Sequence, residues 1–232
     1  MKKSTYLSIL TILVLIPATL WLGTQLKGRW HYLTSTLVIL ETMLPFFLSF
    51  EARRPQAREL VTIAVMAALA VAGRVAIPVP NFKAITGIVM IAGMALGPQV
   101  GFMTGAVSAF ASNFFYSQGP WTPWQMLAYG MGGFLAGVLF YKRTWSSGRL
   151  GAVLETIFAF LAVILMVGPL LDACTIFTTG SRLSWRFAFA VLAAGFPHNV
   201  IHGLSCAATV LLLSKPLLTK LNRLKTKYGM ME

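Results

Sequence analysis

Long apolar runs separated by short polar stretches dominate the chain. Eight of these runs are candidates for membrane-spanning helices, since crossing the hydrocarbon core takes about 20 mostly apolar residues, or fewer where protein shields the helix. They cover residues 6–22, 33–50, 60–77, 84–96, 99–116, 123–141, 150–171 and 185–214. The runs lack the short apolar-polar alternation of transmembrane β-strands. The pattern therefore predicts helices throughout.

Two of the runs carry features that disturb a regular helix. Run 84–96 is short and ends at Gly97-Pro98, so we expect a tilted, irregular or protein-shielded segment there. Run 185–214 contains Pro197, whose missing N–H kinks or breaks a helix. A plain kink and a break that opens a substrate cavity both fit this proline.

A basic linker at residues 51–59 (EARRPQARE) divides the chain. Before it lies a pair of predicted helices within residues 1–50, and after it a six-helix region over 60–232 that ends in a basic tail. The first run follows two lysines, as a signal peptide does. Because the run is long and has no clear small-residue cleavage site before Trp21, we expect it to be retained as an anchor.

Composition agrees with lipid as the solvent. Of the 232 residues, 57% are hydrophobic and 11% are charged, and the mean hydropathy is +0.75, far from the balance of a soluble domain. No water reaches the bilayer core, so backbone polar groups there must be satisfied within helices or closed barrels. We therefore expect an all-α, multi-pass protein of the cell membrane.

The net charge of +13 comes from basic clusters between the apolar runs, a placement that indicates membrane topology and not nucleic-acid binding. With the N-terminus inside, 13 of the 19 Lys and Arg residues fall on the inner side. The other six are Lys27, Arg29, Arg74, Lys83, Arg182 and Arg186. The positive-inside rule then predicts that both termini are cytoplasmic.

Catalytic chemistry has no support in the sequence. The six acidic residues are scattered, and no HExxH, GxSxG or P-loop motif is present. We expect no enzymatic activity and no catalytic cofactor, so active transport would take its energy from a partner or an ion gradient. Cys174 and Cys206 lack disulfide or metal-ligand spacing and are expected to be packing residues.

Small residues recur at helical spacing in three places. Ala64, Ala68 and Ala72 share one face of the third run, and such a face lets another helix approach closely. Docking of a partner and packing within the chain both fit this face. Glycines at the same spacing within residues 93–105, and again within 133–137, are interpreted as packing residues.

Aromatic and amide residues gather in two stretches, around residues 79–83 and 113–125, which the predicted topology places outside. Such side chains can form a pocket with stacking surfaces and oriented hydrogen bonds. The residues expected to contact a ligand are Asn81, Phe82, Lys83, Asn113, Phe114, Tyr116, Gln118, Trp121, Trp124 and Gln125. An interfacial aromatic belt explains any single tryptophan as well, but a belt does not require the amides, glycine and prolines around it.

The last run contains a compact polar motif at residues 198–202. His198 and His202 are four residues apart and so share a helical face, with Asn199 beside them. Polar groups at that depth usually face protein or a water-filled cavity. Substrate contact, structural hydrogen bonding, and metal ligation completed by a third ligand all remain open. Glu41 is similarly isolated within the second run, with no partner evident from the sequence.

Several of these stretches together resemble the substrate-binding S component of an energy-coupling-factor (ECF) vitamin transporter. They are Asn81-Phe82-Lys83, residues 93–105, Asn113-Phe114-Phe115, GPWTPWQ at 119–125 and KLNRLKTKYG at 220–229. The resemblance covers roughly residues 60–229. It implies a six-helix subunit that captures a vitamin outside the cell and partners with a membrane scaffold and two cytoplasmic ATPases. The face of Ala64, Ala68 and Ala72 resembles the surface that docks on the scaffold.

The N-terminal pair departs from that six-helix pattern. The expected fold is thus a six-helix S-component-like core preceded by two additional transmembrane helices. The aromatic-rich outer motifs resemble those of S components associated with cobalamin, and a bulky corrinoid suits a broad aromatic surface. Another vitamin or micronutrient is the alternative ligand. A stand-alone secondary transporter and a structural membrane protein are the alternative functions, although the few charged residues within spans form no evident relay.

Overall fold

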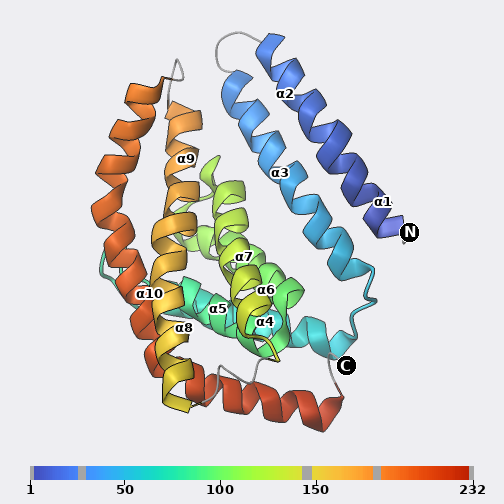
Figure 1. The fold of residues 1–232 in the computed structure, drawn as a ribbon, viewed down its shortest axis with the longest axis vertical. Coiled ribbons are helices and arrows are strands. Elements are labelled where there is room, and N and C mark those ends of the chain that lie inside the picture. Colours follow the sequence, from blue (N-terminus) through green and yellow to red (C-terminus); the bar gives the residue numbers. More distant parts are fainter. Residues whose placement is uncertain (1–2, 26–29, 143–147, 180–183, 230–232) are drawn as a thin grey trace.

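The computed structural model describes residues 3–25, 30–142, 148–179 and 184–229, and helices account for nearly all of them (Figure 1). In chain order the elements are α1 (Lys3–Leu10), the π-helical turn η1 (Thr11–Leu15), α2 (Ile16–Gln25), α3 (Trp30–Glu51), α4 (Ala57–Val75), α5 (Ile85–Leu96), α6 (Pro98–Tyr116), α7 (Trp121–Phe140), α8 (Gly148–Ala162), the π-helical turn η3 (Val163–Val167), α9 (Gly168–Thr179) and α10 (Trp185–Tyr228).

Each π-helical turn continues into its neighbours, so the described residues form eight continuous helices that overlap the eight predicted runs. Within the described ranges, four stretches are long and apolar enough to cross a membrane: Tyr6–Gly23, Leu33–Glu51, Gly148–Thr178 and Trp185–Tyr228. The all-helical, multi-pass class is therefore confirmed. The number of crossings and the cytoplasmic location of both termini stay predictions.

Local sequence signals explain several helix ends. Gly97, at φ 99°, separates α5 from α6, and Pro98 occupies the first turn of α6, where its missing N–H costs no hydrogen bond. Ser184 caps α10 because its side chain accepts a hydrogen bond from the Phe187 N–H at 3.2 Å. The left-handed Gly229 follows the last turn of α10.

Helix α5 lies at the centre of the molecule. All 12 of its residues are buried, and it packs against α4, α6, α7 and α10. A helix of this length spans about 18 Å at a rise of about 1.5 Å per residue, less than the hydrocarbon core of about 30 Å. The surrounding helices shield its ends from lipid. The expectation of a protein-shielded short segment at residues 84–96 is thus confirmed.

Glycines bring α5, α6 and α7 into backbone contact. A Cβ atom at Gly93 or Gly101 would collide with the carbonyl oxygen of Gly133, and one at Gly133 would collide with that of Gly101. Three helices therefore meet at one point where no side chain fits. The interpretation of these glycines as packing residues is confirmed, and we call Gly93, Gly101 and Gly133 the glycine junction.

Helix α10 is longer than the predicted run, which ended at residue 214. It continues through Pro197 and Pro216 to Tyr228, so the predicted basic tail is largely helical. Figure 1 shows the red C-terminal section of α10 running crosswise beneath the other helices. Proline within a helix is an ordinary cause of such a bend. Pro197 does not interrupt the helix.

The N-terminal pair packs onto the core through α3, which contacts α6, α7 and α9. Phe46 stacks on Phe102 of α6 with ring centroids 4.2 Å apart, and its edge meets Phe134 of α7 at 5.1 Å. Between the two helices of the pair, the Thr19 hydroxyl donates a 2.6 Å hydrogen bond to Glu41 Oε1. The structure thereby supplies the partner of Glu41 that the sequence did not reveal.

Candidate functional site

A network of polar side chains joins α4, α6 and α7 at the end of the molecule predicted to face outward. Arg74 Nη1 donates to Ser112 Oγ, and to Asn113 Oδ1 at 3.0 Å. Asn113 Nδ2 in turn donates to Thr122 Oγ1 and to Gln125 Oε1, both at 2.9 Å. We call these five residues the outer network. It links an arginine to two amides inside an otherwise apolar bundle.

Tyr116 and Lys83 extend the outer network toward the surface. The Tyr116 hydroxyl donates to the Arg74 backbone carbonyl at 3.0 Å, and its ring centroid lies 4.7 Å from the Arg74 guanidinium carbon. Lys83 Nζ lies 5.7 Å from the same ring and donates to the Ile77 carbonyl. Gln118 accepts a 2.9 Å hydrogen bond from the Thr122 hydroxyl. Cations, amides and an aromatic ring thus converge here.

His202 occupies a second polar position, in the interior of the helix bundle. Its Nε2 lies 2.8 Å from the Thr86 hydroxyl, and its ring meets Tyr129 edge-on at 6.1 Å between centroids. Both His202 and Tyr129 are buried. His202 therefore joins α10 to α5 and α7 through polar and ring contacts.

His198 and Asn199 have different surroundings from His202. Asn199 is buried and donates to Asp172 Oδ2 of α9 at 2.7 Å, whereas His198 is exposed and its Nδ1 lies 3.2 Å from the Ala194 carbonyl oxygen. In the part of the chain that the structure describes, no group of three His, Cys, Asp or Glu side chains could hold a metal ion. The two histidines therefore have different environments, since His198 is exposed and His202 is buried beside Thr86 and Tyr129.

The remaining predicted ligand contacts divide by exposure. Asn81, Phe114 and Trp121 are exposed, and Phe82 is half-buried. Trp124 instead lies in the interior, stacked on Phe177 at 5.7 Å, and its indole N–H has no acceptor among the described residues. The outer aromatic surface is therefore narrower than the motif GPWTPWQ suggests.

The structure adds residues that the predicted site did not contain. They are Arg74, Ser112, Thr122, Thr86 and Tyr129. One signal for Arg74 was present in the sequence, because an ionisable residue within a predicted span marks a functional position by default. The hydroxyl residues gave no such signal.

The three alanines of the predicted docking face are exposed. Ala64, Ala68 and Ala72 point away from the molecule, while the core side of α4 is formed by the buried residues Ile63, Met66, Ala67 and Ala70. A stripe of small side chains is thus left uncovered along α4.

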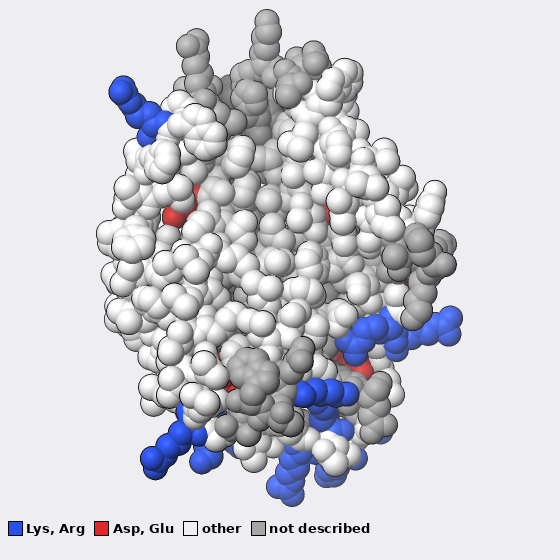
Figure 2. Space-filling model, in the orientation of Figure 1, with Lys and Arg blue, Asp and Glu red and all other residues white. Residues whose placement is uncertain are grey.

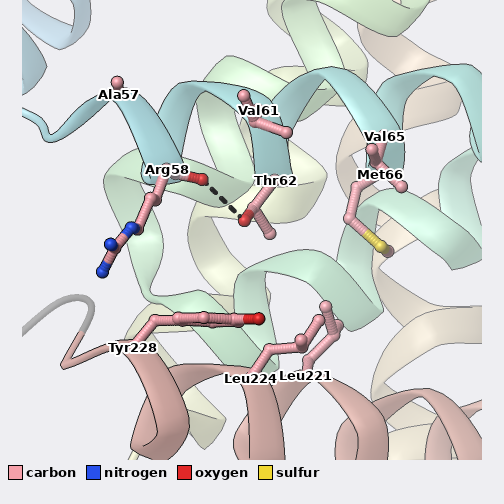
Figure 3. Close-up of a pocket in the computed structure, with 9 residues that line it drawn as sticks. All are labelled: Ala57, Arg58, Val61, Thr62, Val65, Met66, Leu221, Leu224 and Tyr228. Carbon is pink, nitrogen blue, oxygen red and sulfur yellow. Dashed lines mark hydrogen bonds between the residues drawn. The ribbon is translucent and has the colours of Figure 1, made fainter.

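A groove of about 510 Å³ lies beside this stripe, between α4 and the C-terminal section of α10 (Figure 3). Val61, Val65, Met66, Leu221 and Leu224 form its apolar walls. Thr62 turns its hydroxyl onto its own helix, donating to the Arg58 carbonyl at 2.8 Å. At the mouth, the Arg58 guanidinium carbon lies 5.3 Å from the Tyr228 ring centroid.

Basic side chains concentrate at this end of the molecule. Figure 2 shows Lys and Arg gathered around its lower part, where the C-terminal section of α10 runs. There Arg53 pairs with Glu59 at 3.7 Å, and Lys225 Nζ lies 4.5 Å from the Tyr141 ring centroid. The side of the membrane on which this end lies stays a prediction.

A comparison with protein families assigns the chain. The model of the family described as ECF-type riboflavin transporter, S component, matches residues 55–219. That range contains α4 to α9 and most of α10, and excludes the N-terminal pair. No curated protein and no solved structure matches the chain significantly. With most of its length matched, the chain belongs to the family of ECF-type riboflavin transporter S components.

Proposed function

We propose that this chain captures riboflavin, or a close flavin relative, as the substrate-binding subunit of an ECF transporter. The single observation that carries the proposal is the family match over residues 55–219. Membership in this family supports the role of a vitamin-binding transport subunit. The proposal places it in the cytoplasmic membrane with both termini inside.

The chemistry of the outer network supports a flavin. A flavin has a flat ring system whose one edge carries nitrogen and carbonyl acceptors, and a polyhydroxyl side chain. The amides Asn113 and Gln125 and the cation Arg74 offer hydrogen bonds to such groups. The exposed rings of Phe114 and Trp121 offer stacking surfaces nearby. Aromatic faces with a few oriented polar groups are typical of small-molecule sites.

Cobalamin has less support. That expectation depended on a broad outer aromatic surface, and Trp124 is packed against Phe177 instead of contributing to it. The matched family is of the riboflavin type. Cobalamin is therefore kept as a competing ligand in the binding test below.

Transport requires partners in this proposal, namely a membrane scaffold and two cytoplasmic ATPases. The stripe of Ala64, Ala68 and Ala72 and the groove beside it form the proposed docking surface for the scaffold. In lipid, helices associate through close packing, which small side chains permit. Both features are exposed along α4, so a helix could lie across them.

The test is binding to the purified chain in nanodiscs. Riboflavin is expected to bind saturably, with quenching of its fluorescence, and to raise the thermal stability of the protein, because a ligand of the folded state stabilises it by mass action. Cobalamin and thiamine are expected to do neither. Stabilisation by cobalamin without any response to riboflavin would refute the flavin assignment.

Uptake separates a transporter subunit from a stand-alone transporter. Cells that produce this chain alone are expected to bind riboflavin without accumulating it, and co-production of the scaffold and ATPases is expected to give accumulation. Accumulation by the chain alone, without ATP, would contradict the ECF mechanism.

A further inference from the structure

Arg74 is a cation whose side chain hydrogen-bonds to neutral side chains. It lies in the last turn of α4, half-buried, and its side chain reaches across to α6. Among the described residues, no carboxylate lies within 4.0 Å of the Arg74 guanidinium group. The ion pair that these residues do form, between Arg53 and Glu59, is near the opposite end of α4. A helix C-terminus favours a nearby cation, but this does not require the side chain to turn inward. Its inward direction calls for another cause.

The guanidinium group has hydrogen-bonding capacity that the described residues leave unused. Of its five N–H donors, the two on Nη1 face Ser112 and Asn113. Nε and Nη2 make no hydrogen bond with any described residue, and neither is among the fully buried atoms that lack a partner. Three donors are therefore open to an incoming group.

The surroundings hold the guanidinium in a fixed orientation. Ser112 and Asn113 accept from one edge, and the Tyr116 ring lies 4.7 Å from the central carbon. Asn113 is itself fixed by Thr122 and Gln125. The free Nε and Nη2 donors then form a planar fork, which matches two adjacent acceptor atoms better than a lysine could.

We propose that Arg74 recognises the acceptor edge of the flavin ring, with Nε and Nη2 donating to the ring nitrogen N1 and the neighbouring C2 carbonyl oxygen. The inference depends on the proposed function, because it names the residue by which the proposed flavin site recognises its ligand. Acceptor oxygens also occur on the ribityl chain, so the test must separate the two sources. Lumiflavin has the same ring edge and lacks the ribityl chain.

The test compares Arg74→Gln and Arg74→Lys with the control Arg149→Gln, which removes an exposed arginine at the start of α8. Loss of two hydrogen bonds from a charged donor corresponds to at least about a 100-fold weaker affinity. We expect that loss in Arg74→Gln for riboflavin and lumiflavin alike, a smaller loss in Arg74→Lys, and none in Arg149→Gln.

A second measurement separates contact from a merely structural role. A positive charge beside N1 favours the reduced flavin, which carries more negative charge at that position. Riboflavin bound to the wild-type chain is therefore expected to have a more positive reduction potential than riboflavin bound to Arg74→Gln. Arg74→Lys, which keeps the charge, is expected to lie between them, and it decides the question if Arg74→Gln does not fold.

The outcomes have distinct meanings. Unchanged affinity in both Arg74 variants overturns the contact, and a loss confined to riboflavin overturns its assignment to the ring edge. Weaker binding with an unchanged potential shows a structural role and also overturns the inference. Failure of the wild-type chain to bind any flavin would instead refute the proposed function.

Discussion

Helices α6 and α7 are joined in two different ways along their length. At the glycine junction, the backbones of Gly101 and Gly133 touch and no side chain intervenes. Near the predicted outer end, Asn113 of α6 bridges to Thr122 and Gln125 of α7 through side-chain hydrogen bonds. One pair of helices thus has a dry contact at one level and a polar contact at another.

The two contacts differ in what they allow. Where backbone atoms are in van der Waals contact, the distance between the two helices is fixed. Any added side-chain volume must then push the helices apart, which costs stability. Hydrogen bonds between amides can exchange a protein partner for a ligand group at small cost, since such bonds in membrane proteins are worth only about 0.6 kcal/mol on average. We infer that the glycine junction fixes the framework on which the outer network adapts to a ligand.

The largest effect is expected from a methyl group at the glycine junction. Gly133→Ala places Cβ against the carbonyl of Gly101, so the helices must separate, and we expect a loss of about 3 kcal/mol in the free energy of unfolding. The measurement is thermal or denaturant unfolding in detergent. Ligand affinity is expected to fall with it, because the framework moves.

The neighbouring glycine provides the matched control. At Gly132 an added Cβ would find the flexible end of Met90 as its nearest contact, at 3.3 Å. Gly132→Ala is therefore expected to change stability by less than about 1 kcal/mol. Equal losses for the two substitutions would mean that backbone contact is not what joins the helices.

A smaller effect on stability, but a larger relative effect on binding, is expected from Asn113→Leu. The substitution removes three hydrogen bonds and leaves Arg74 with one protein acceptor on Nη1. We expect a loss of about 1 to 2 kcal/mol in stability and at least about a tenfold loss in riboflavin affinity. Fluorescence titration and unfolding of the same sample measure both.

Asn222→Leu is the control for that substitution, because Asn222 is exposed on the C-terminal section of α10. It should change neither quantity. If Asn113→Leu lowered stability as much as Gly133→Ala while binding was retained, the outer network would be part of the framework and the contrast between the two regions would disappear.

Much of the framework could be predicted from the sequence, because it depends on local pattern. Apolar runs located the eight helices, and the short run before Gly97-Pro98 indicated a helix shielded by protein. The four-residue spacing of glycines within residues 93–105 and within 133–137 indicated close packing. Length, period and residue size carry this information without any knowledge of which helices meet.

The outer network could be predicted only in part, because it depends on which faces meet. Arg74 and Asn113 are 39 residues apart, and Thr86 and His202 are 116 apart. Helical period places each residue on a face of its own helix, yet it does not pair that face with another.

The end of α10 was missed for a different reason. Hydropathy falls after residue 214, but a helix that leaves the bilayer needs no apolar run, and α10 continues to Tyr228.

The smallest effect on the isolated chain is expected from Ala68→Trp, on a surface that belongs to neither region. Ala68 is exposed between Ala64 and Ala72, away from the glycine junction and the outer network, so stability and riboflavin affinity should stay within about 0.5 kcal/mol of wild type. A bulky indole there would hold a partner helix at a distance, because close approach needs small side chains. Uptake with the scaffold and ATPases present should therefore be lost.

Leu161→Trp, on the exposed side of α8, is the control that should transport normally. Normal uptake by Ala68→Trp would remove the alanine stripe from the docking surface, and loss of binding would show that this face of α4 is coupled to the site.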